Sequence, residues 1–190
     1  MKRMFVGATL AALTVAVAPA FAALAVGATA PAIKGNVYIA GKGAAFDLQA
    51  ALRKGPVVLF FFPGAYTAGC NVEAKAFADN IDKFNAANAT VVGVTAGHGT
   101  SDRADGKMAA SLDEAVKDFS ATHCSGKFPV MAVTPEVVKA YDASLAQRPD
   151  WSGRISYVIG RDGKITFVHN AMNPTEHVTK TLEAVAALKR

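Results

Sequence analysis

The residue best suited to chemistry in this chain is a cysteine at the start of a predicted helix. Cys70 follows a short apolar run and a loop that contains Pro63 and Gly64. A thiol in the first turn of a helix lies near backbone N–H groups whose partial positive charge favours the thiolate, the nucleophilic form of cysteine. Cys70 also belongs to the apolar face of this helix, and burial opposes ionisation. We therefore expect a nearby cation that favours the thiolate.

The elements that position Cys70 form a strand, a helix and a second strand. Residues 57–62 and 90–95 are short runs rich in Val or Phe, which predicts buried strands. Between them, apolar side chains recur every three or four residues and mark one face of a helix: Cys70, Ala74, Phe77, Ile81 and Phe84. A unit of this size predicts two parallel strands joined by a right-handed crossover.

A second helix and a third strand are expected next. Ser111 and Glu114 have the spacing of a capping box, and an apolar face follows them. The run 128–133 predicts a strand. Thr134 and Pro135 then suit the first positions of a short helix.

The end of the chain predicts a hairpin and a final helix. The runs 154–159 and 165–169 alternate on either side of an Asp-Gly pair, which is typical of two antiparallel strands joined by a tight turn. Asn173 and Pro174 then begin the last helix. Together these elements predict an α/β fold with a central mixed sheet flanked by helices.

The N-terminal segment has the composition of a signal peptide. Residues 1–22 begin with Lys2 and Arg3, continue through an apolar stretch and end in Ala-Phe-Ala, a pattern that signal peptidase cleaves. We predict cleavage after Ala22 and export to the periplasm, an oxidising compartment, with no membrane attachment afterwards. The alternative is an uncleaved N-terminal anchor. We expect residues 23–190 to form a single domain.

The overall composition excludes several classes of protein. With 52% hydrophobic and 18% charged residues, the chain does not have the composition of a disordered protein. Its 2 cysteines can make only one bridge, so a disulfide-dense scaffold is excluded. Lys and Arg number 20 against 15 Asp and Glu, but the excess is not clustered, and no nucleic-acid partner is predicted.

Pro63, Thr67 and Cys70 match the pattern PxxxTxxC, and the chain resembles the peroxiredoxins. It is most similar to the bacterioferritin-comigratory branch of the alkyl hydroperoxide reductase and thiol-specific antioxidant superfamily. The likeness extends from residues 26–31 through Phe128-Pro129 to Arg154 and the following hairpin, and so covers nearly all of the mature chain. It implies a thioredoxin-like fold and, in this branch, commonly a monomer.

The resemblance implies a role for each motif residue. Cys70 would attack the O–O bond of hydrogen peroxide or an organic hydroperoxide and become a sulfenic acid. The Thr67 hydroxyl would hydrogen-bond peroxide and thiolate, and Pro63 would shield the sulfur from water. Arg154 would be the cation that stabilises the thiolate and the developing oxyanion. No metal or other cofactor is required, and a thioredoxin-like dithiol would supply the electrons.

The second cysteine raises the question of how a sulfenic acid at Cys70 is reduced. In the branch that the chain resembles, the commonest resolving cysteine lies five residues after the nucleophile, where this chain has Lys75. Cys124 is our first choice instead, because some relatives carry their resolving cysteine in that region. An intermolecular bridge or an external thiol are the alternatives.

Three other functions are alternatives to a peroxidase. A thiol-disulfide oxidoreductase normally needs a C-x-x-C pair, and residues 71–73 contain no second thiol. A copper-binding module would need a second sulfur where Ala74 stands. A non-catalytic, chaperone-like relative is a further option.

Two histidines, Tyr66 and one long loop are also interpreted from the sequence. His98 and His123 do not have zinc-site spacing, and Tyr66 is expected to be a rim aromatic. The stretch 96–110 predicts a long loop, either a lid or a solvated loop without a role.

Overall fold

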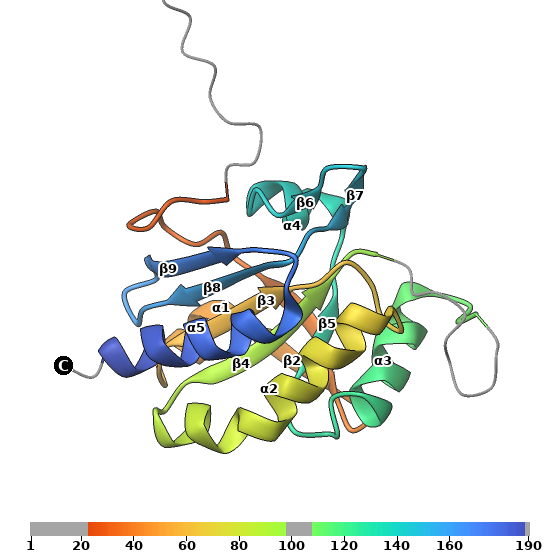
Figure 1. Cartoon of the computed structure of the whole chain (residues 1–190), viewed down its shortest axis with the longest axis horizontal. Coiled ribbons are helices and arrows are strands. Elements are labelled where there is room, and N and C mark those ends of the chain that lie inside the picture. Colours follow the sequence, from red (N-terminus) through yellow and green to blue (C-terminus); the bar gives the residue numbers. More distant parts are fainter. Residues whose placement is uncertain (1–22, 98–107, 189–190) are drawn as a thin grey trace, which may run out of the picture.

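A computed structural model describes residues 23–97 and 108–188 (Figure 1). The proposed signal segment and His98, with most of the predicted 96–110 loop, lie outside the described residues. The strands are β1 Lys34–Ile39, β2 Lys42–Asp47, β3 Val57–Phe61, β4 Thr90–Thr95, β5 Val130–Ala132, β6 Ser144–Leu145, β7 Arg148–Ser152, β8 Ile155–Ile159 and β9 Ile165–Asn170. The helices are α1 Leu48–Leu52, α2 Ala68–Ala86, α3 Leu112–Thr122, α4 Pro135–Ala140 and α5 Pro174–Ala187.

The main sheet has seven strands in the order β2-β1-β5-β4-β3-β8-β9. Strand β3 pairs in parallel with β4, and β4 with β5, while β8 runs antiparallel to β3 and β9 antiparallel to β8. The mixed sheet predicted from the sequence is therefore confirmed, including the parallel β3-α2-β4 crossover and the β8-β9 hairpin. Because β3 is central and fully buried, it gives the loop that follows it a rigid base.

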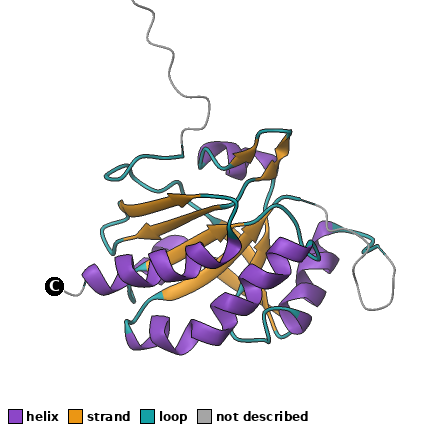
Figure 2. Ribbon diagram, viewed as in Figure 1, coloured by secondary structure: helices purple, strands orange, loops and turns teal. Residues whose placement is uncertain are grey.

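Helices cover both faces of the sheet (Figure 2). The inner faces of α2, α3 and α5 pack on one side, where Phe60 stacks on Phe77 with ring centroids 4.2 Å apart. The other face is covered by α1 and α4, whose buried residues share one apolar cluster with the alternate β3 residues Leu59 and Phe61. This alternation follows from the period of two along a strand buried on both sides. No helix in the described ranges is both long and apolar enough to span a bilayer.

Three small features were not predicted. The β1-β2 hairpin and α1 lie in a region without clear alternation, because β2 is an outer strand whose first four residues are exposed. The separate β6-β7 ladder contains Pro149, which argues against a central strand but is tolerated in an isolated two-stranded ladder. Strand β5 is shorter than predicted, since the 128–133 run pairs with β4 only from Val130.

Candidate active site

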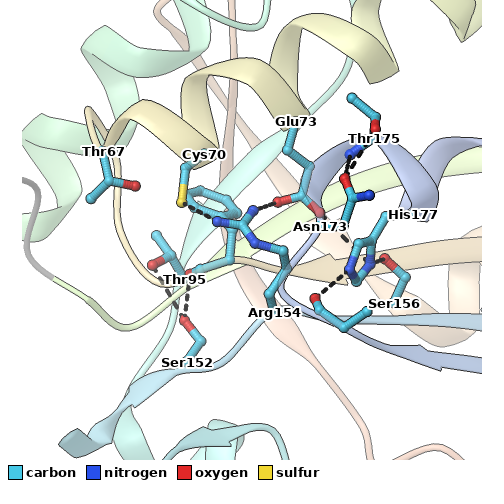
Figure 3. Close-up of polar contacts among 12 residues, drawn as sticks. Thr67, Cys70, Glu73, Thr95, Ser152, Arg154, Ser156, Asn173, Thr175 and His177 are labelled. Atoms are coloured by element: carbon cyan, nitrogen blue, oxygen red, sulfur yellow. Dashed lines mark hydrogen bonds and ion pairs between the residues drawn. The ribbon is translucent and has the colours of Figure 1, made fainter. Parts of the chain in front are cut away.

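Cys70 lies where β3 passes into α2. Thr67 is the N-cap residue of α2, so Cys70 is the third helical residue, and it is 1% exposed. The Arg154 guanidinium donates a hydrogen bond from Nη2 to Cys70 Sγ at 3.5 Å (Figure 3). Arg154 is itself buried, directly before β8. The structure thus brings together the thiol and the cation that the buried helix start was expected to need.

Thr67 lies beside Cys70, with its hydroxyl on the side that faces the sulfur (Figure 3). The hydroxyl donates to the Gly64 carbonyl oxygen at 3.2 Å and makes no capping bond to α2. Its oxygen lone pairs therefore remain able to accept a hydrogen bond. Pro63 is half-buried in the same loop. A Cβ at Gly97 would lie 1.7 Å from the Pro63 carbonyl oxygen, so the end of β4 approaches this loop closely only because residue 97 is glycine.

Tyr66 anchors the loop instead of forming its rim. Its side chain is 1% exposed, and its hydroxyl bonds to the Ala115 carbonyl oxygen at 3.3 Å and to the Asp118 carboxylate, both on α3. The prediction of a rim aromatic was therefore wrong. Tyr66 has a φ of 64°, which is rare for a bulky residue, and its ring packs edge-on against Phe119 of α3, with centroids 5.7 Å apart.

Ser152 ties three segments together next to the site. Its hydroxyl donates to the Phe62 carbonyl oxygen at 2.7 Å and accepts from the Ala96 N–H at 3.1 Å. These bonds join the ends of β3 and β4 to the segment that carries Arg154. Ser152 thus bonds the segment that leads to Arg154 to Phe62, directly before the loop that carries Thr67.

We expect Ser152→Ala to lower the free energy of unfolding by about 1 to 3 kcal/mol, because two buried backbone groups lose their partner. Urea unfolding measures this loss. Ser144→Ala is the matched control, since Ser144 pairs with Ser152 across the β6-β7 ladder and is only half-buried. Equal stability of the two variants would contradict the bridging role.

Glu73 holds the other side of Arg154 and was not predicted from the sequence. Its carboxylate is an ion-pair partner of Arg154 Nη1, and both side chains are buried. Glu73 lies three residues after Cys70, on the predicted apolar face of α2. A carboxylate at such a position requires a buried cation, so the presence of Glu73 on this face could have indicated a buried ion pair from the sequence alone. Burial raises the pKa of Glu73 to about 8, although Arg154 opposes this shift.

This raised pKa predicts how stability depends on pH. Between the ordinary value of 4.5 and about 8, the folded state holds a proton on Glu73 that the unfolded state has lost. The free energy of unfolding therefore falls as pH rises through this window. Urea unfolding at several pH values is expected to show the fall in the parent and a smaller one in Glu73→Gln. Identical slopes in the two proteins would contradict the assignment.

Two further polar side chains lie behind Glu73 and were also missed. His177 of α5 is 0% exposed, with Nδ1 at 2.8 Å from Ser156 Oγ and Nε2 at 2.9 Å from the Ala171 carbonyl oxygen. Burial lowers the pKa of His177 to about 4. The ring is therefore neutral near neutral pH.

Cys124 follows α3 and is 0% exposed. Both cysteines are free thiols, and both belong to the apolar cluster between the sheet and helices α2, α3 and α5. Burial raises the pKa of the Cys124 thiol well above its usual value. The neighbouring His123 packs its ring on Phe119, with centroids 5.2 Å apart. Within the described ranges, no group of three or more His, Cys, Asp or Glu is placed to hold a metal ion.

The fold and the site together define a thioredoxin-like protein with a buried, guanidinium-paired cysteine at a helix start. The model of the AhpC/TSA family matches residues 26–168, and the chain belongs to that family. This confirms the family that Pro63, Thr67 and Cys70 predict.

Individual relatives agree with the predicted branch. The chain is 28% identical over 144 residues to a putative chloroplastic peroxiredoxin Q of Oryza sativa subsp. indica, covering 70% of this chain and 55% of that protein. It is also 28% identical to the chloroplastic peroxiredoxin Q of Sedum lineare, covering 70% and 65%. The chain thus spans about half the length of the first of these relatives and 65% of the second.

Solved structures confirm the thioredoxin-like fold. The crystal structure of peroxidoxin BcpB from Mycobacterium tuberculosis matches with a TM-score of 0.67 at 23% identity, over 87% of this chain and 98% of that one. AhpC of Mycobacterium tuberculosis matches with a TM-score of 0.70 at 20% identity, over 88% and 94%.

Proposed function

We propose that this chain is a thiol-dependent peroxidase that reduces hydrogen peroxide and organic hydroperoxides through Cys70. The observation that carries the proposal is the 3.5 Å contact between Arg154 Nη2 and Cys70 Sγ at the buried start of α2. A guanidinium in that place stabilises a thiolate, which is the form that attacks peroxides. Membership of the AhpC/TSA family supports the same activity.

In the proposed reaction, the Cys70 thiolate attacks one oxygen of the peroxide. A sulfur–oxygen bond forms as the O–O bond breaks, and the other oxygen takes up a proton and leaves as water or an alcohol. Cys70 becomes a sulfenic acid. Arg154 faces the sulfur and is placed to stabilise negative charge on the departing oxygen. The Thr67 hydroxyl also faces the sulfur (Figure 3) and would hydrogen-bond the peroxide.

The direct test is peroxide consumption by the purified chain with a dithiol reductant, using Cys70→Ser as the comparison. Consumption that depends on Cys70 supports the proposal, and equal consumption by the variant overturns it. The alternatives are not favoured. A thiol-disulfide oxidoreductase and a copper module both lack their second sulfur at 71–74, where the chain has Asn-Val-Glu-Ala.

For the reductive half of the cycle, we propose that Cys124 resolves the Cys70 sulfenic acid, with a thioredoxin-like dithiol as the final electron donor. The proposal is supported by the location of both thiols in one apolar cluster. Because Cys124 is fully buried and its raised pKa keeps it protonated, the region around it must open before the two sulfurs react.

We expect Cys124→Ser to keep the first oxidation of Cys70 while turnover with a thioredoxin-like donor falls by about tenfold or more. Rapid mixing with peroxide measures the first step, and steady-state peroxide consumption measures turnover. Unchanged turnover would show that an external thiol performs the resolution. A dimer linked by a disulfide in the oxidised parent would indicate an intermolecular bridge.

We also propose that residues 1–22 are a cleaved signal peptide and that residues 23–190 act in the periplasm as a monomer. In support, the Leu24 N–H donates to the Tyr157 hydroxyl at 3.2 Å, so the fold already holds the chain next to the proposed cleavage site. The intact mass of the exported protein is expected to begin at Ala23, and a start at Met1 would reject cleavage. Sedimentation of that protein tests the monomer.

A further inference from the structure

A row of buried polar side chains extends from Arg154 on the side away from Cys70. It consists of Glu73 on α2, Ser156 on β8 and His177 on α5, and all three are 0% exposed. Glu73 uses Oε2 for Arg154, whereas its Oε1 has no hydrogen-bond partner. That oxygen lies 3.8 Å from His177 Nδ1 (Figure 3). A buried carboxylate oxygen without a partner is unusual and requires an explanation.

The hydrogen bonds of His177 define its tautomer. The Ala171 carbonyl oxygen only accepts, so Nε2 carries a hydrogen and donates to it at 2.9 Å. In the neutral ring, Nδ1 then has a lone pair, which accepts from the Ser156 hydroxyl at 2.8 Å and also faces Glu73 Oε1. At 3.8 Å the two atoms are beyond hydrogen-bond distance, but the electron-rich Nδ1 facing Oε1 opposes the ionised form of Glu73 and favours its neutral, protonated form.

Charged and titratable groups face these buried polar side chains from each element packed against them. Glu73 is faced by Arg154, His177 and, through Arg154, by Cys70. His177 is also faced by Glu176 of its own helix and by His169 of β9, whose ring centroid is 4.6 Å away.

Of these groups, Arg154 is the single fixed cation in contact with both Cys70 and Glu73. A buried site accommodates one ion pair more readily than a pair with an additional anion. A thiolate at Cys70 and a carboxylate at Glu73 therefore oppose each other.

We propose that Glu73 is protonated and neutral when Cys70 ionises, and that His177 is a positioning residue that keeps this proton on Glu73. The thiol releases its proton to solvent, and Glu73 adds no second negative charge to the site. Arg154 then faces one anion, the sulfur. The use of this device for peroxide reduction rests on the proposed function, but the ionisation itself does not.

The experiment is a pH titration of Cys70 in the Cys124→Ser protein, where it is the remaining thiol of the chain. The ultraviolet absorbance of the thiolate is read as a difference against the Cys70→Ser/Cys124→Ser protein. His177→Phe removes the acceptor at Nδ1 and is expected to move the midpoint of Cys70 ionisation up by about one pH unit. His177→Asn keeps an acceptor near Nδ1 and is expected to restore the parent midpoint.

The Glu73→Gln background separates this coupling from a purely structural role of His177. The amide is neutral at every pH, so His177→Phe is expected to leave the midpoint of Cys70 ionisation unchanged in that background. An equal shift in the parent and in the Glu73→Gln background would overturn the proposal. So would an unchanged midpoint in His177→Phe with Glu73 intact.

Ser156→Ala provides a second test that does not depend on the folding of His177→Phe. It removes the hydroxyl that competes with Glu73 for Nδ1. The midpoint of Cys70 ionisation is therefore expected to fall when Glu73 is intact and to stay unchanged in the Glu73→Gln background. A rise, or equal shifts in both backgrounds, would overturn the proposal. The titration uses no peroxide. A protein that titrates as expected but forms no sulfenic acid with peroxide would therefore reject the proposed function alone.

Discussion

Replacement of Cys70 by serine is expected to abolish peroxide reduction, with a loss of at least about 10³-fold in the rate constant for reaction with peroxide. A serine hydroxyl stays protonated at neutral pH and cannot form a sulfenic acid. The position is otherwise well suited to the substitution, because Cys70 is a small buried side chain at a helix start. Stopped-flow mixing with hydrogen peroxide measures the loss.

The matched control is Cys124→Ser, which changes the other buried cysteine in the same way. It is expected to react with the first equivalent of peroxide at nearly the parent rate. If the two variants lost the first reaction equally, the loss would reflect damage to the shared apolar cluster and not the removal of the nucleophile.

Replacement of Arg154 by glutamine is expected to lower the rate constant with peroxide by about 10²- to 10³-fold. Arg154 contacts the Cys70 sulfur through Nη2 and the Glu73 carboxylate through Nη1, so one planar group both stabilises the thiolate and is itself held in place. Glutamine carries no charge and leaves Glu73 buried without a cation. Arg154→Lys is expected to recover little of the rate, because one ammonium on a flexible stem cannot reproduce this two-sided contact.

Arg148→Gln is the control for the loss of one positive charge. Arg148 lies over the Trp151 ring at 4.5 Å in the exposed part of β7, outside the Cys70 contact. We expect its rate constant to stay within about threefold of the parent, since exposed charges are well screened. A similar loss in both variants would show that net charge, and not the fixed guanidinium at the sulfur, controls the reaction.

The part of the fold that carries the nucleophile was predictable because its signals are local. Buried strands such as β3 read as continuous apolar runs, and the spacing from Cys70 to Phe84 matches one face of α2. Ser111 and Asn173 are N-caps whose side chains accept from Glu114 N and Thr175 N, as their positions predict. The outer hairpin β1-β2 has no such alternation, which explains why it was not predicted.

The candidate site was only partly predictable for a different reason. Cys70 and Thr67 are neighbours in the sequence, but Arg154 reaches them through the pairing of β8 with β3, which no local pattern encodes. Its assignment to the site therefore depended on family resemblance. Glu73 and His177 are polar residues on otherwise apolar helix faces, and such positions become interpretable only when the partner from another element is known.

The central claim is that Cys70, held by Arg154, is the nucleophile that peroxide oxidises. The most direct measurement mixes the reduced Cys124→Ser protein with an equimolar amount of hydrogen peroxide and a sulfenic-acid trapping reagent, followed by peptide mass spectrometry. The trapped adduct is expected on Cys70 in this protein and to be strongly reduced when Arg154→Gln is added. An unmodified Cys70 after peroxide is consumed, or equal trapping with and without Arg154, would contradict the account.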